Sequence, residues 1–137
     1  MTPQQYCIDK TNESGSSFLP AFYFLGKEKK MALTALYAFC REVDDIVDEC
    51  KEYEAGKVKL DWWRSEITCL FSGNPQHLVT KCLVNYIDKF DLNKEYFIEI
   101  IDGMEMDLNF NRYNNFKKLQ HYCYRVASSV GILSAKI

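Results

Sequence analysis

Apolar residues recur at helical spacing along almost the whole chain, and no stretch alternates between apolar and polar residues as a half-buried strand would. This pattern predicts an all-α fold. Turn-forming residues separate the helices, and Gly73-Asn74-Pro75 is the clearest such group. We expect helices over residues 3–12, 18–25, 28–51, 57–71, 76–90, 93–108 and 116–135, with breaks at 14–17, at Ala55-Gly56 and over the polar residues 109–115. In the helix over 57–71 we expect one buried stripe, made of Trp62, Trp63, Ile67 and Leu70.

The size and charge of the chain narrow the class of protein. Its 137 residues suit a single domain covering 1–137, and 47% hydrophobic with 26% charged residues is ordinary for a soluble globular protein. The net charge of −2 and the scattered basic residues argue against nucleic-acid binding. The longest nearly apolar stretch, Met31 to Cys40, is too short to span a membrane, and contact with a membrane surface stays open.

The cysteines point to a reducing compartment. The six are widely and irregularly spaced without a C-x-x-C pair, which argues against a zinc or redox motif. The polar residues from Met1 to Lys10 do not resemble a signal peptide. Reduced thiols in a cytoplasmic protein are therefore expected.

One face of the long helix over 28–51 carries a stripe of polar residues. Tyr37, Arg41, Asp44 and Asp48 are spaced by four, three and four residues, so they lie along a narrow arc of that helix. Apolar residues flank the arc on both sides, and we therefore expect it to face an interior cavity. One flank consists of Leu36, Cys40, Val43 and Val47, and the opposite one of Phe39 and Ile46. Two carboxylates one turn apart in such a place repel each other and require a cation. Mg²⁺ shared with a diphosphate fits these ligands, and the Arg41 guanidinium can bind the diphosphate oxygens.

A solvated acidic helix end is the competing interpretation of the same residues. The Asp-Asp-x-x-Asp string beginning at Asp44 continues into Glu49, and such charge runs often simply face water. The apolar surroundings and the aligned tyrosine and arginine favour the binding site.

Three segments together resemble one protein family. Ala35–Glu49 is similar to the first aspartate-rich motif of squalene and phytoene synthases, and Gly15-Ser-Ser-Phe18 resembles their N-terminal serine–phenylalanine motif. Tyr122–Gly131 resembles their Y-C-Y-x-V-A-G-x-V-G signature, with Ser128 in place of glycine. Ile101–Leu108 together with Trp62-Trp63-Arg64 most resembles the bacterial hopanoid-pathway branch. The resemblance implies the N-terminal part of an isoprenoid synthase helical bundle around a central cavity.

The resemblance also implies an activity and its cofactor. These enzymes condense two farnesyl or geranylgeranyl diphosphates head to head to presqualene diphosphate, squalene or phytoene. On this chain Asp44 and Asp48 would bind Mg²⁺, while Arg41 and Tyr37 would bind the diphosphate. The resemblance does not distinguish between the two substrates or the three products.

Three further residues receive roles from the resemblance. Ser17 would reach the diphosphate and Phe18 the prenyl chain. Tyr122 would act with Arg41 as a catalytic residue, removing a proton or steering a cation. A structural tyrosine with a satisfied hydroxyl is the alternative for Tyr122.

The family's second aspartate-rich motif follows the Tyr122 segment at a distance that this sequence does not reach. We therefore expect the N-terminal half of a two-sided site, completed by a C-terminal half or a second chain. A degenerate, inactive remnant of such an enzyme is the remaining alternative. Two other functions stay open: a non-catalytic helical diphosphate-binding or partner subunit, and a head-to-tail prenyl diphosphate synthase or terpene cyclase.

Overall fold

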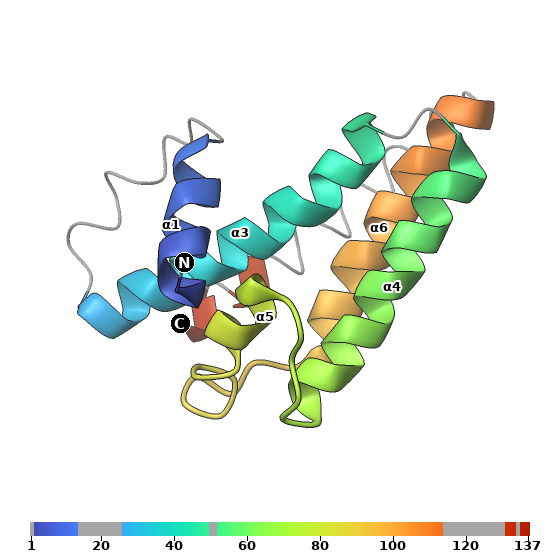
Figure 1. Ribbon diagram of the computed structural model, residues 1–137. Coiled ribbons are helices and arrows are strands. Elements are labelled where there is room, and N and C mark those ends of the chain that lie inside the picture. Colours follow the sequence, from blue (N-terminus) through green and yellow to red (C-terminus); the bar gives the residue numbers. More distant parts are fainter. Residues whose placement is uncertain (1, 14–25, 50–51, 114–130, 134) are drawn as a thin grey trace.

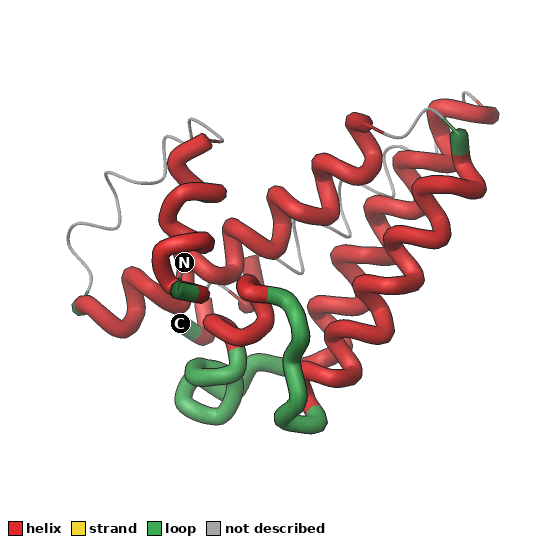
Figure 2. The backbone as a smooth tube through the Cα atoms, viewed as in Figure 1, coloured by secondary structure: helices red, strands yellow, loops and turns green. Residues whose placement is uncertain are grey.

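The computed structural model describes residues 2–13, 26–49, 52–113, 131–133 and 135–137 (Figure 1). Throughout these residues the regular structure is helical, which confirms the all-α prediction (Figure 2). The helices are α1 (Pro3–Glu13), α3 (Lys27–Glu49), α4 (Tyr53–Phe71), α5 (Leu78–Leu83) and α6 (Lys94–Tyr113). The predicted helix over 18–25 and most of the one over 116–135 lie outside the described residues.

Helices α4 and α6 form an antiparallel pair that packs along most of its length (Figure 1). Helix α3 packs against both of them and also contacts α1 and α5. The long α3 therefore connects α1 and α5 with the α4–α6 pair. No helix within the described ranges is long and apolar enough to cross a membrane.

The core is centred on Phe39 of α3. Its ring lies 5.7 Å from the Trp63 ring of α4 and 5.4 Å from the Phe97 ring of α6, both in edge-on arrangements. All three rings are buried, and aromatic pairs in this geometry stabilise a core beyond the area that they bury. The contact fixes how α3 sits against the α4–α6 pair.

The predicted break at Ala55-Gly56 is wrong, because α4 begins at Tyr53 and runs through both residues. Gly56 is buried, and a Cβ atom there would approach Leu108 Cδ2 of α6 to 2.5 Å. The glycine therefore allows a close approach of two helices and does not interrupt one.

The predicted helix over 76–90 is wrong in its extent, since α5 ends at Leu83. The Asn85 side-chain amide donates to the carbonyls of Lys81 and Cys82, at 3.4 and 3.3 Å. The Tyr86 N–H bonds back only three residues, to Leu83 O at 2.9 Å. A side chain that competes for helix carbonyls explains the tighter turns that follow.

Helix α6 extends beyond its predicted end at residue 108, and includes the first part of the polar stretch that we expected to be a linker. Polar residues have only weak preferences for or against the helix, so the turns already packed on α4 determine its continuation.

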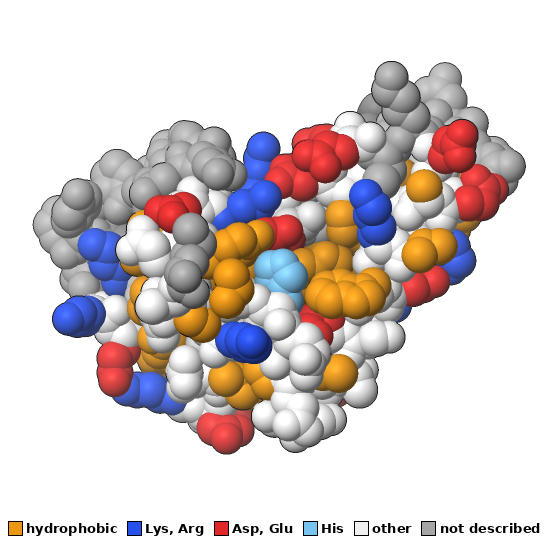
Figure 3. Space-filling model, in the orientation of Figure 1, with side chains coloured by type: hydrophobic (Ala, Val, Ile, Leu, Met, Phe, Trp, Pro, Cys, Tyr) orange, Lys and Arg blue, Asp and Glu red, His pale blue; other side chains and the backbone are white. Residues whose placement is uncertain are grey.

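The buried stripe predicted for α4 is confirmed at Trp63, Ile67 and Leu70 and is wrong at Trp62, whose side chain is 48% exposed. Trp62 lies at the edge of the stripe, where its ring packs edge-on against Trp63 and His77, at 5.2 and 6.1 Å. Figure 3 shows apolar side chains gathered around a histidine on this face. A tryptophan at the border of a helix stripe can thus pack on one side and face water on the other.

Candidate functional site

Helix α3 positions the polar stripe. Alanines with high helix propensity recur along its first half, at residues 32, 35 and 38. The predicted apolar flanks are buried at Leu36, Val43 and Val47 on one side and at Phe39 and Ile46 on the other, whereas Cys40 is half-buried. Because both flanks are embedded, the arc between them is held in a fixed orientation.

Three of the four stripe residues line one pocket of about 210 Å³. Tyr37, Arg41 and Asp44 come from successive turns of α3, and Cys40 and Met104 complete the lining. Met104 comes from α6 and is only 4% exposed, so it forms a wall facing α3. Asp48 lies one turn beyond Asp44, at an exposed position outside this lining.

Arg41 contacts two carboxylates of its own helix. Its Nε lies 3.0 Å from Asp45 Oδ1, and its Nη1 lies 3.8 Å from Asp44 Oδ2. The side chains of Arg41 and Asp44 are 40% and 38% exposed, so these ion pairs contribute little to stability. An anion in the pocket would compete with weakly held carboxylates for the guanidinium.

The carboxylates next to the stripe attach α3 to α1. Lys10 Nζ lies 2.7 Å from Asp45 Oδ2 and 3.8 Å from Glu42 Oε1. The Tyr6 hydroxyl donates a hydrogen bond to Glu42. Of the two neighbouring aspartates, Asp44 therefore lines the pocket, whereas Asp45 stabilises the packing of α1 against α3.

Burial governs the protonation of two lining residues. It raises the pKa of the Tyr37 hydroxyl further above neutral pH, where this group is a hydrogen-bond donor in any case. Burial, with a smaller effect of the Asp44 charge, raises the pKa of the Cys40 thiol to about 12. Cys40 is therefore neutral and forms a weakly polar part of the wall instead of a reactive thiolate.

Two carboxylates of α3 could provide part of a magnesium site. Among the described residues, no group of three or more His, Cys, Asp or Glu side chains could hold a metal ion. Asp44 and Asp48 offer two carboxylates one turn apart on α3. Magnesium commonly binds through one or two carboxylates and fills its remaining positions with water and phosphate oxygens.

Cys40 and Met104 are lining residues that the site prediction missed. Cys40 was assigned only to the apolar flank of the stripe. Met104 lies inside Ile101–Leu108, a segment that carried a family resemblance but no site assignment. Ser17, Phe18 and Tyr122, the other predicted site residues, lie outside the described residues.

A second pocket of about 510 Å³ lies where α1 meets the start of α3. Ile8, Met31 and Tyr86 give it an apolar lining, and Lys27, Glu28 and Lys30 add charges of both signs. None of the stripe residues contributes to it.

An all-α fold with an arginine, a tyrosine and an aspartate lining one pocket is suited to binding an anion together with a cation. Three comparisons with known proteins specify the class further. The model of the squalene/phytoene synthase family matches residues 11–137. The phytoene synthase of Arthrospira platensis is 33% identical over 133 residues, which cover 97% of this chain and 43% of that protein. Phytoene synthase 3 of the Zea mays chloroplast is 32% identical over 131 residues, covering 96% of this chain and 31% of that protein.

A solved structure gives the same result. The crystal structure of a dehydrosqualene synthase in complex with ligand superposes with a TM-score of 0.80 at 29% identity, covering 96% of this chain and 46% of that one. The chain belongs to the squalene/phytoene synthase family, as its motifs predicted. It spans less than half the length of each of these relatives.

Proposed function

We propose that the protein takes part in the head-to-head condensation of two prenyl diphosphates. The observation that carries this proposal is the shared pocket of Tyr37, Arg41 and Asp44, in a chain of the squalene/phytoene synthase family. The arrangement places a cation, a hydroxyl donor and a carboxylate around one space, as recognition of a metal–diphosphate group requires.

Each residue of the stripe receives a role. Asp44 and Asp48 hold Mg²⁺, which when bound supplies positive charge that offsets the negative charge of the diphosphate. Arg41 offers its guanidinium fork to the diphosphate oxygens, and the protonated Tyr37 hydroxyl donates to them. These contacts keep the leaving diphosphate bound and oriented while its bond to the prenyl carbon breaks.

The prenyl chain requires a different surface. Cys40 and Met104 provide uncharged side chains beside the polar ones, and these offer the prenyl chain a less polar surface. The family motifs assign diphosphate contact to Ser17, prenyl contact to Phe18, and proton removal or cation steering to Tyr122. We retain these assignments as part of the proposal, with the opposing half of the site supplied by further chain or by a second subunit.

The substrate and product follow from the same proposal. The relatives named above are phytoene and dehydrosqualene synthases, whereas Ile101–Leu108 with Trp62-Trp63-Arg64 resembles the hopanoid branch. Incubation with farnesyl or geranylgeranyl diphosphate and Mg²⁺, followed by product analysis, distinguishes squalene-type from phytoene-type products. A linear twenty-carbon prenyl diphosphate, formed from farnesyl diphosphate when isopentenyl diphosphate is also supplied, would contradict head-to-head condensation. We propose a cytoplasmic location with contact to a membrane surface, from which such substrates and products are accessible.

The test of the site itself is binding of diphosphate. Asp44→Ala combined with Asp48→Ala should weaken Mg²⁺-dependent binding of inorganic diphosphate at least about tenfold, equivalent to about 1.4 kcal/mol. Glu49→Ala, an exposed acid at the same end of α3, is the matched control and should leave binding unchanged. Titration calorimetry with and without Mg²⁺ measures both. Undiminished Mg²⁺-dependent binding in the double variant would mean that the stripe is only a solvated acidic surface.

A further inference from the structure

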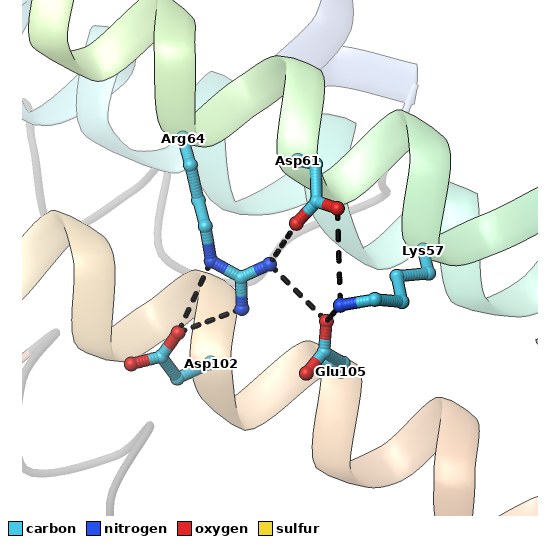
Figure 4. A network of polar contacts seen from close by, with 5 residues as sticks. All are labelled: Lys57, Asp61, Arg64, Asp102 and Glu105. Atoms are coloured by element: carbon cyan, nitrogen blue, oxygen red, sulfur yellow. Dashed lines mark hydrogen bonds and ion pairs between the residues drawn. The ribbon is translucent and has the colours of Figure 1, made fainter.

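A forked ion-pair network joins α4 to α6 (Figure 4). Arg64 of α4 places Nη2 2.7 Å and Nε 3.2 Å from Asp102 Oδ1, and Nη1 3.1 Å from Glu105 Oε1. Its Nη1 also lies 2.6 Å from Asp61 Oδ1 on its own helix. One guanidinium thus binds two carboxylates on neighbouring turns of α6.

The network is partly shielded from water. Arg64 and Glu105 are each 24% exposed, and Asp102 is 39% exposed. Burial by itself would lower the pKa of Arg64, but its hydrogen bonds to Asp102, Asp61 and Glu105 outweigh that effect and raise it. A planar fork held at two points restricts the rotation of α6 as well as its distance from α4.

The residue between the two carboxylates lines the candidate site. Met104 lies two residues after Asp102 and one before Glu105, so on a helix its side chain points away from both. It faces α3 and lines the pocket with Tyr37, Cys40, Arg41 and Asp44. The turn that Arg64 holds is therefore the turn that forms the α6 wall of the pocket.

We propose that Arg64 is a positioning residue for prenyl-chain binding, acting through Met104. This inference rests on the proposed function, because it assumes that the pocket binds a prenyl diphosphate. Arg64 is not among the residues that line the pocket. Rotation of α6 would move the Met104 side chain relative to Cys40 and Tyr37 and so change the apolar surface offered to the prenyl group. Arg41 and Asp44 belong to α3 and would stay in place.

A double-mutant cycle tests the coupling. Arg64→Met, Met104→Ala and their combination are compared for binding of farnesyl thiodiphosphate and of inorganic diphosphate, both with Mg²⁺, by titration calorimetry. We expect Arg64→Met to weaken binding of the prenyl analogue about fivefold and binding of inorganic diphosphate less than about twofold. In the Met104→Ala background, Arg64→Met should change binding of the analogue by less than about twofold, because the Met104 side chain that Arg64 positions is absent.

Lys57→Met is the matched control. Lys57 belongs to the same network, but its Nζ lies 3.4 Å from Glu105 Oε1 and 3.8 Å from Asp61 Oδ2, and its side chain is 46% exposed. It should leave both affinities unchanged. If Arg64→Met does not fold, as judged by circular dichroism, Arg64→Lys keeps the charge without the fork and should weaken binding of the analogue in the same direction.

Two results overturn different claims. Suppose that wild-type protein binds inorganic diphosphate, but that Arg64→Met changes the affinity for the prenyl analogue equally in the wild-type and Met104→Ala backgrounds. The positioning role of Arg64 is then wrong, and the proposed function stands. If wild-type protein binds no inorganic diphosphate with Mg²⁺, the proposed function itself is wrong.

Discussion

Gly56 of α4 lies so close to Leu108 of α6 that a Cβ atom at residue 56 would come within 2.5 Å of Leu108 Cδ2. Leu108 is only 4% exposed, so its side chain has little room to move aside. Arg64 contacts the same helix two turns further along α4. The pairing of α4 with α6 therefore depends on the absence of a side chain at Gly56 and on an ion-pair network at Arg64.

Gly56→Ala should destabilise the protein by about 1 kcal/mol, because the strain of overpacking exceeds the gain in helix propensity. Urea unfolding measures the change. In a Leu108→Ala background the same substitution should instead stabilise by about 0.5 kcal/mol, since the obstacle is gone. Gly26→Ala, where a Cβ atom would meet nothing within 4 Å, is the control. Equal effects in both backgrounds would show that Leu108 is not the limiting contact.

Glu66→Gln should cost about 2 kcal/mol of unfolding free energy. The Glu66 side chain is buried, and its Oε2 accepts from the backbone N–H groups of Gln76 and His77, each at 2.8 Å, and from the Thr80 hydroxyl. A glutamine loses the charge that strengthens these bonds at the start of α5. Glu49→Gln, at an exposed position, should change stability by less than about 0.5 kcal/mol. A loss no larger than the control's would contradict the structural role of the carboxylate.

His77 should make stability depend on pH. Burial lowers the pKa of His77, an effect that Lys10 reinforces and that Glu42 and Glu66 oppose. Its Nδ1 accepts a hydrogen bond from the Val79 N–H at 3.1 Å, which requires the neutral ring. Since the unfolded state binds the proton more readily, this contribution is complete above pH 6.5 and is lost as the pH falls toward the lowered value.

The measurement is urea unfolding at several values from pH 7.5 to pH 5, in wild type and in His77→Asn. Asparagine preserves an N-cap acceptor without titrating, and His121 is present in both proteins and cancels. The wild type should lose more stability than the variant as the pH falls. Parallel profiles would show that His77 is not the group responsible.

Substitution of the two adjacent tryptophans by alanine should lower the free energy of unfolding by very different amounts. Trp63→Ala removes a ring that packs against Phe39 in the core and should cost about 3–5 kcal/mol. Trp62→Ala removes a half-exposed ring and should cost about 1 kcal/mol. Thermal unfolding of both variants measures the difference, and similar losses would contradict the assignment of Trp63 alone to the core.

Regular periodicity made two helices predictable. The expected ranges 3–12 and 28–51 compare with the observed Pro3–Glu13 and Lys27–Glu49. The sequence misled at Gly56, where the residue type that ends many helices instead permits a tertiary contact. It also misled beyond Leu83, where the Asn85 side chain competes with the backbone for carbonyls.

The candidate site was predictable only along one helix. Spacing alone placed Tyr37, Arg41 and Asp44 together, since a helix converts sequence intervals into a shared face. Met104 reaches the pocket from another helix, and no interval in the sequence encodes that approach. The pairing of Asp45 with Lys10 is likewise a product of tertiary packing.

The different contacts of the two adjacent aspartates limit which part of this helix could be transferred to a designed protein. Asp45 is held by Lys10 from α1, while its neighbour Asp44 faces the pocket. A copy of the Asp-Asp-x-x-Asp string grafted onto a bare scaffold would present both carboxylates without that lysine. Their mutual repulsion would then oppose the helix that is meant to display them. The transplantable unit is therefore a pair of crossing helices with its counter-charge, and the acidic string is one component of it.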